Sequence, residues 1–238
     1  MQTRPPKVIK KMARRHKIIL VISLMVAVSL VNAVDFSVID NTGDSPGGRT
    51  FQEEIGGENY GRQALSYATD FVLDLFQQTN PSDRKPITKI TLFMENSDGV
   101  AYNSQAQEIH FNVGYLADVS EDVTREFTGV VYHEVVHSWQ WNGADQAPGG
   151  LIEGIADYVR LKAGYAPGHW VGPGGGDTWD QGYDVTARFL EYCNDLRNGF
   201  VAELNEKMRS GYSDGFFVDL LGKDVNQLWG EYKAQYGQ

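Results

Sequence analysis

The first half of the chain after residue 34 alternates apolar and polar residues with the short period that favours strands. VDFSVIDN (34–41) follows this rhythm, and KITLFMEN (89–96) has the composition of a strand. VAYN (100–103) and EIHFNVGYL (108–116) predict two more strands joined by a turn at SQAQ. Between the first two of these segments, 34–41 and 89–96, residues 59–77 place apolar side chains at helical spacing. This half therefore predicts a small sheet with a helix packed on it.

The second half changes to helical spacing. Ser120 is the expected N-cap of a helix, with Glu121 and Asp122 in its first turn, and Asn142-Gly143 is the expected end. Further helices are predicted at 148–164, 181–198, 201–208 and 225–236. A sheet followed by helices is typical of the α+β class, and we expect a single domain from residue 34 to 238.

Residues 1–33 have a different composition from the rest of the chain. Seven lysines and arginines precede the apolar run IILVISLMVAVSL (18–30), and Val31-Asn32-Ala33 follows it with a small residue at its end. This pattern predicts a signal peptide cleaved after Ala33, with an uncleaved membrane anchor as the alternative. We therefore expect a secreted, extracellular protein with no stable membrane association after cleavage.

Loss of that segment makes the protein strongly acidic. It leaves 14 basic and 31 acidic residues, a formal charge of −17, because the segment carries seven basic residues and no acidic one. Such a charge disfavours nucleic acid as a partner. The single cysteine, Cys193, lies among apolar residues and is expected to be buried and inert. We expect a monomer.

The stretch HEVVHSWQW carries the strongest chemical signal. His133 and His137 are four residues apart, so a helix presents both imidazoles on one face, close enough to bind one metal ion. Glu134 lies beside that face, in the position of a general base for a metal-bound water. The alternative is a pair of structural histidines, but unpaired imidazoles among Val131, Val135 and Val136 would be costly.

A catalytic zinc ion needs a third protein ligand. The next predicted helix, GLIEGIADYVRLKAG, offers Glu153 and Asp157 four residues apart on one face. Glu153 is the predicted ligand, and Asp157 is predicted to accept the remaining ring N–H of a ligand histidine. The reverse assignment, with Asp157 as the ligand, stays open. Gly149, Gly150 and Gly154 indicate that this helix packs closely against a neighbour.

These stretches, with GGGDTWDQGYDVTARFLEYC and DLLGKDVNQLWGEYK, resemble the plant basic secretory protein family. The resemblance implies a zincin-like fold and a secreted, pathogenesis-related zinc metallopeptidase of the apoplast or cell wall. A more distant similarity to the gluzincins also implies Glu153 as the ligand. The spacing from His137 to Glu153 is shorter here than in thermolysin-like enzymes. The acidic charge means that a basic, wall-binding surface does not carry over.

The sequence thus predicts peptide hydrolysis with Glu134 as the base, Zn²⁺ as the cofactor and a protein or peptide as the substrate. Tyr183 is the first candidate to donate to the oxyanion, followed by His169 and Tyr165. The alternative function is a non-catalytic secreted defence protein that binds a ligand and keeps the metal for structure. An aminopeptidase is disfavoured because no G-x-M-E-N-like stretch is present to hold a substrate amine.

Overall fold

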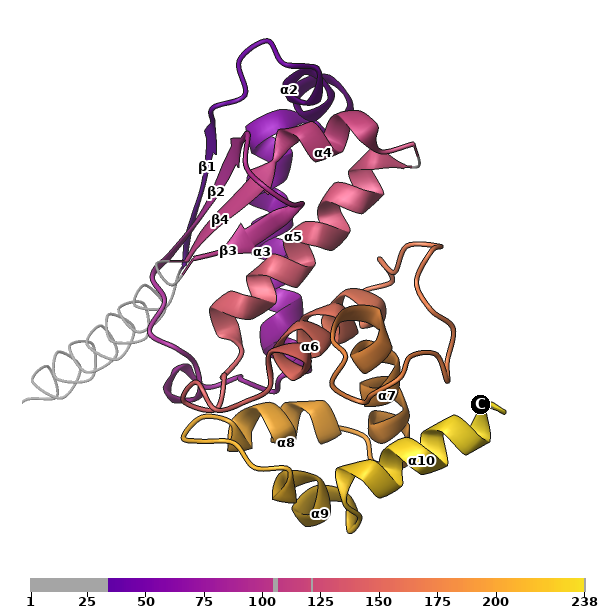
Figure 1. Ribbon diagram of the computed structural model, residues 1–238. Coiled ribbons are helices and arrows are strands. Elements are labelled where there is room, and N and C mark those ends of the chain that lie inside the picture. Colours follow the sequence, from indigo (N-terminus) through magenta and orange to yellow (C-terminus); the bar gives the residue numbers. More distant parts are fainter. Residues whose placement is uncertain (1–33, 105–106, 121, 238) are drawn as a thin grey trace, which may run out of the picture. The chain divides into compact units, whose positions relative to one another are not determined.

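Four strands form one mixed sheet in the order β1-β2-β4-β3 (Figure 1). The computed structural model describes residues 34–104, 107–120 and 122–237, so the predicted signal peptide lies outside the described residues. β2 and β4 are parallel, and β3 pairs antiparallel with β4 at the edge. The strands are β1 (Asp35–Asp40), β2 (Lys89–Glu95), β3 (Ala101–Asn103) and β4 (Glu108–Asn112).

Two long helices, α3 (Gly57–Leu75) and α5 (Val123–Trp139), pack on this sheet. Phe111 of β4 contacts Phe127 of α5, with ring centroids 5.1 Å apart. On α3, a Cβ at Gly61 would come within 3.0 Å of Val38 on β1, so glycine permits the close approach of this helix. The sheet with a packed helix is thus confirmed, and α5, the helix of the histidine motif, belongs to the same layer.

The sequence prediction extended the fourth strand too far. β4 ends at Asn112, and VGYLAD forms a short helix, α4 (Val113–Asp118). The Asn112 side chain accepts a hydrogen bond from Gly114 N at 3.0 Å and caps that helix. Two short elements near the N-terminus were also missed: α2 (Pro46–Thr50) and the π-helical segment Phe51–Ile55.

Both predicted ends of the motif helix need correction. Its N-cap is Asp122, not Ser120, and the Asp122 carboxylate accepts from Arg125 N at 2.9 Å. Its last residue is Trp139, three residues before Asn142, because Gln140 adopts an extended backbone. Trp141 N then donates to Asn205 Oδ1 at 2.8 Å, so a residue far along the chain fixes the path that leaves the helix.

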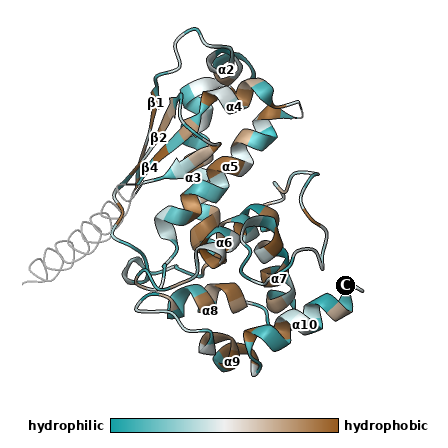
Figure 2. Ribbon diagram, viewed as in Figure 1, coloured by the Kyte–Doolittle hydropathy of each residue, from teal (hydrophilic) through white to brown (hydrophobic). Residues whose placement is uncertain are grey.

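The remaining helices are α6 (Gly149–Lys162), α7 (Tyr183–Leu196), α8 (Phe200–Lys207), α9 (Gly215–Leu221) and α10 (Val225–Gln235). All but α9 were predicted to within two residues, which confirms the α+β class. The missed helix is short and ends at Leu221, with Gly222 as its C-cap at a positive φ of 73°. Figure 2 shows hydrophobic positions interleaved with hydrophilic ones along these helices.

Helix α6 packs closely against the start of α7, as its glycines indicated. A Cβ at Gly154 would lie 2.2 Å from Cγ2 of the fully buried Thr186. One turn earlier, a Cβ at Gly150 would lie 1.8 Å from the carbonyl oxygen of Asp180. Thr186 Oγ1 also accepts from Gly182 N and donates to Trp179 O, which fixes the segment that precedes α7.

Cys193 lies on α7 and is fully buried, as predicted. Burial raises the pKa of its thiol, which keeps the sulfur protonated. Over the described part of the chain, no helix has the length and apolarity needed to cross a membrane.

We expect Gly154→Ala to lower the free energy of unfolding by about 1–3 kcal/mol, because the added methyl group would overlap Thr186. Gly149→Ala is the matched control on the same helix, since a Cβ there meets nothing within 4 Å. The control should leave stability unchanged or raise it by about 0.4–1 kcal/mol. Urea denaturation of both variants measures the difference, and equal stabilities would contradict the close contact.

Candidate functional site

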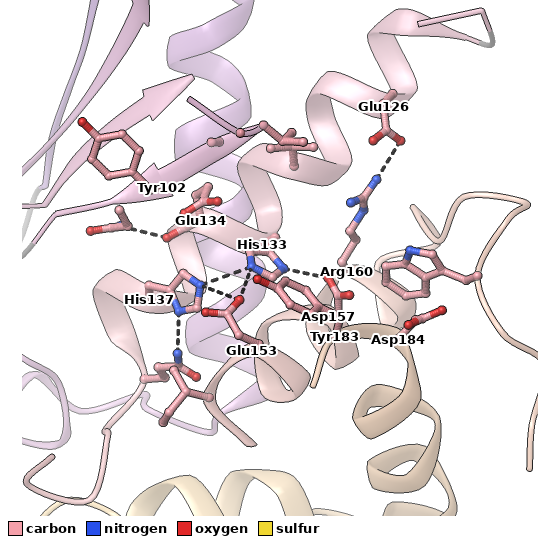
Figure 3. Close-up of a pocket in the computed structure, with 18 of the residues that line it drawn as sticks. Tyr102, Glu126, His133, Glu134, His137, Glu153, Asp157, Arg160, Tyr183 and Asp184 are labelled. Carbon is pink, nitrogen blue, oxygen red and sulfur yellow. Dashed lines mark hydrogen bonds and ion pairs between the residues drawn. The ribbon is translucent and has the colours of Figure 1, made fainter. Parts of the chain in front are cut away.

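His133 and His137 project from α5 into a cleft (Figure 3). Their Nε2 atoms are 3.2 Å apart, and the rings meet edge to face at 79°. His133 is buried, with 8% of its surface exposed, and its neighbours Val131, Val135 and Val136 are fully buried. The four-residue spacing therefore turns both imidazoles toward one point, in a setting where each ring nitrogen needs a partner.

Glu153 and Asp157 approach from α6, but they contact opposite sides of the His133 ring. Glu153 Oε2 lies 3.1 Å from His133 Nε2 and 3.6 Å from His137 Nε2. Asp157 Oδ1 lies 2.7 Å from His133 Nδ1. The carboxylate of Glu153 thus lies near both Nε2 atoms, whereas Asp157 contacts the other nitrogen of His133; their roles as metal ligand and as partner of a ligand histidine stay predictions.

His133, His137 and Glu153 form a group of donor atoms that fits a tetrahedral metal ion. Their three separations are 3.1, 3.2 and 3.6 Å. Zinc bonds of about 2.0 Å in tetrahedral geometry place ligand atoms about 3.3 Å apart, so these residues match the ion in spacing. Two imidazoles and one carboxylate are also a ligand set that zinc accepts while keeping its fourth position open.

The charges at the site favour a bound cation. Burial opposes protonation of His133, but hydrogen bonds to Asp157 and Glu153 outweigh it and raise the pKa of His133 to about 10. Burial would raise the pKa of Glu153, but its hydrogen bonds to the two histidines lower that pKa well below its usual range. Both shifts show that the carboxylates stabilise positive charge at the imidazoles, which is the charge that a metal ion brings.

Glu134 lines the same cleft next to this group. It is 5% exposed, and its Oε2 atom is buried without a hydrogen-bond partner among the described residues. Burial raises the pKa of its carboxyl above the ordinary value, against the attraction of the two histidines. Burying a carboxylate oxygen without a hydrogen bond costs folding free energy. Such costly groups are expected at sites of proton transfer, which makes Glu134 a candidate base.

Asn103 ties the edge strand β3 to the motif helix. Its Nδ2 donates to the Glu134 backbone oxygen at 2.9 Å and to Ser138 Oγ at 2.8 Å. One side of the cleft is therefore a strand edge held at a fixed distance from Glu134.

Tyr183 lies over the ring of His133, on the side of the cleft opposite the β3 edge. The rings are nearly parallel, at 11°, with centroids 6.1 Å apart. Tyr183 has a φ of 47°, a left-handed conformation that costs on the order of 1–3 kcal/mol outside glycine. The charge of Glu153 and partial burial raise the pKa of its phenol, so the hydroxyl remains a hydrogen-bond donor.

The cleft has a volume of about 850 Å³ and extends past His133, His137 and Glu153 in both directions. Its lining includes Glu126 and Gln140, which lie seven residues before and after His133, about 10 Å each way along this part of the chain. At the Glu126 end, Arg160 Nη2 forms a 2.7 Å ion pair with the Glu126 carboxylate. His169 lines the cleft as well, whereas Tyr165 packs against Tyr132 with centroids 5.0 Å apart.

Comparison with known proteins identifies the family of this chain. A family model described as "Peptidase of plants and bacteria" (BSP) matches residues 31–232. The chain belongs to this family. A protein of Boswellia serrata named "Basic secretory protease" is 52% identical over 59 residues, which are 25% of this chain and 67% of that relative. No solved structure matches.

The match confirms the resemblance to the basic secretory proteins. The family description indicates a peptidase, and the relative's name indicates a secreted protease. Sequence reasoning missed two residues that position the site in this family member, Asn103 and Thr186. Neither carries a motif, and each acts through a contact between elements distant in sequence.

We expect Glu153→Ala to abolish zinc binding, because only two protein ligands would remain. Asp157→Ala should weaken zinc binding by roughly 10–100-fold, because the carboxylate orients His133 without reaching the metal position. Isothermal titration with zinc measures both effects. Complete loss in Asp157→Ala with retention in Glu153→Ala would reverse the assignment.

Proposed function

We propose that the protein is a secreted, zinc-dependent endopeptidase with a zincin-like fold. The observation that carries the proposal is the convergence of His133 Nε2, His137 Nε2 and Glu153 Oε2 within 3.1–3.6 Å of one another, with Glu134 buried beside them. The family description, which names a peptidase, supports the reaction class.

In this proposal His133, His137 and Glu153 hold the ion. When bound, zinc polarises the scissile carbonyl and lowers the pKa of a water molecule. Glu134 takes a proton from the attacking water and delivers it to the leaving nitrogen. Its carboxylate is buried beside the three candidate ligands, and its Oε2 has no hydrogen-bond partner among the described residues, so this oxygen is available for both steps.

Tyr183 is the proposed donor to the developing oxyanion. Its ring lies beside His133, and 57% of its surface is exposed, so its hydroxyl is accessible to a substrate in the cleft. Tyr183 has a left-handed backbone, and the residues before it are fixed by the hydrogen bond from Gly182 N to Thr186 Oγ1 and by the close contact at Gly150. These contacts support a fixed position for the Tyr183 side chain, as an oxyanion donor requires.

The cleft supports peptides as the substrate class. Its volume suits several residues of an extended chain, and its lining continues on both sides of the metal ligands, as an internal bond requires. β3 forms the edge of the sheet, and its last residue, Asn103, donates to the backbone oxygen of Glu134. The proposed location is the apoplast or cell wall, the proposed role is plant defence, and a monomer acts. The resemblance to basic secretory proteins supports the location and the role.

We expect Glu134→Gln to keep stoichiometric zinc and the native fold while peptide hydrolysis falls by about 10²–10⁴-fold. The amide keeps the size of the carboxyl and removes the base. Metal analysis, circular dichroism and a fluorogenic peptide assay with and without chelator measure the three properties.

The same pair of proteins separates the peptidase from a non-catalytic protein with a structural metal. The structural role predicts no chelator-sensitive hydrolysis in either protein. Equal, chelator-sensitive hydrolysis in both would show that Glu134 is not the base.

Tyr183→Phe should lower kcat by about 10²–10³-fold with little change in zinc affinity, because it removes one oxyanion donor and keeps the ring. Tyr67→Phe is a matched control, since Tyr67 is also 57% exposed and lies on α3. Steady-state kinetics with one peptide substrate compares the kcat of the two variants with that of the wild type. An unchanged kcat in Tyr183→Phe would direct attention to His169.

A further inference from the structure

Each candidate zinc-binding histidine has its own hydrogen-bond partner, but the two partners differ in chemistry. His133 Nδ1 faces the carboxylate of Asp157 at 2.7 Å. His137 Nδ1 faces the side-chain amide of Gln140, also at 2.7 Å. Gln140 lies three residues after His137 and is 2% exposed, so its amide is buried beside the ring.

Gln140 is held firmly in this position by its backbone. Its N–H donates to Val136 O at 2.8 Å, and its own backbone then turns to an extended conformation that ends α5. The next residue, Trp141, donates from its backbone N to Asn205 Oδ1 at 2.8 Å. These contacts fix the backbone of Gln140 at the C-terminal end of α5, three residues past His137, with the amide beside the ring.

The chemistry of the ring decides which atom of the amide must face it. An imidazole that binds zinc through Nε2 carries its remaining proton on Nδ1, so Nδ1 is a donor and needs an acceptor. The amide nitrogen cannot accept a hydrogen bond, but the amide oxygen can. In the structure, Gln140 Nε2 faces Nδ1, and Gln140 Oε1 is buried without a partner among the described residues.

A half-turn of the amide exchanges its two atoms within the same space. In one orientation Gln140 Oε1 has no partner among the described residues, and in the other Gln140 Nε2 takes its place. The surroundings alone therefore favour neither orientation strongly. The proton on His137 Nδ1 supplies the preference, because only the amide oxygen can accept it.

We propose that Gln140 is the positioning residue of His137: its side-chain oxygen accepts the Nδ1–H of that ring and holds Nε2 toward the metal position. This inference rests on the proposed function, in which His137 is a zinc ligand. Gln140 does for His137 what Asp157 does for His133, with a neutral group in place of a charged one.

Two substitutions at Gln140 test which atom of the amide matters. Gln140→Leu removes both the acceptor and the donor, and it should raise the dissociation constant for zinc by roughly 10–100-fold. Gln140→Glu keeps an oxygen in reach of Nδ1 and removes the donor, and it should bind zinc at least as tightly as the wild type. Gln78→Leu is the matched control, because Gln78 is also a buried glutamine whose Oε1 has no partner in the described part of the chain, and it lies outside the cleft lining.

Competition with a chromophoric chelator gives the zinc dissociation constants, and thermal unfolding shows that each variant is folded. Wild-type affinity in Gln140→Leu would overturn the proposal. Equal weakening in Gln140→Leu and Gln140→Glu would also overturn it, because the amide donor would then be the functional group.

A spectroscopic measurement on the wild type keeps the proposal testable even if Gln140→Leu does not fold. In the zinc-loaded protein labelled with ¹⁵N-histidine, His137 should show a protonated Nδ1 whose hydrogen exchanges slowly with water. An unprotonated Nδ1 would overturn the proposal. If the wild type bound no zinc at all, the proposed function itself would fail, and zinc binding with unchanged affinity in Gln140→Leu would remove only the role of Gln140.

Discussion

The hydrogen bond between His133 and Asp157 joins the two helices on which the site depends. It links α5 to α6 through two residues that are 8% and 3% exposed, so neither side chain has water as a ready substitute partner. Breaking such a buried pair leaves a charge without a partner, which costs far more than the pair contributes. A slip of α6 by one residue, about 1.5 Å along its axis, would also remove Glu153 from the two Nε2 atoms.

The opposite side of α6 is fixed by packing instead of charge. Gly150 and Gly154 leave no room between α6 and the start of α7, and Thr186 fills the contact there. That contact determines where Tyr183 begins its helix, and therefore where its ring lies over His133. One helix thus carries a carboxylate toward the metal position and, through its glycines, brings a tyrosine to the other side of the same histidine.

The sequence predicted those parts of the site that depend on spacing within a helix. His133 and His137, and likewise Glu153 and Asp157, are four residues apart, and such pairs share a face wherever the helix forms. Glycines in α6 indicated close packing, though not that α7 was the neighbour.

The parts that could not be predicted depend on contacts distant in sequence or on a choice between similar local signals. Asn205 fixes the chain where it leaves α5, and nothing near residue 140 reveals that. Ser120 and Asp122 are both suitable caps, and only the hydrogen bond to Arg125 N distinguishes them. In EIHFNVGYL the apolar residues fit a strand or a helix, and the Asn112 cap decides that α4 begins there.

The difference between the two histidine partners follows from the charges around the proposed metal ion. Glu134, Glu153 and Asp157 bring three carboxylates to two imidazoles, and a divalent ion balances two of them. The negative charge that remains would belong to Glu134, which in the proposed mechanism accepts a proton and releases it again. A fourth carboxylate beside His137 would raise the proton affinity of Glu134 further, beyond what burial already does. The amide of Gln140 can orient His137 without adding charge, so the position of the ring and the basicity of Glu134 are set by different groups.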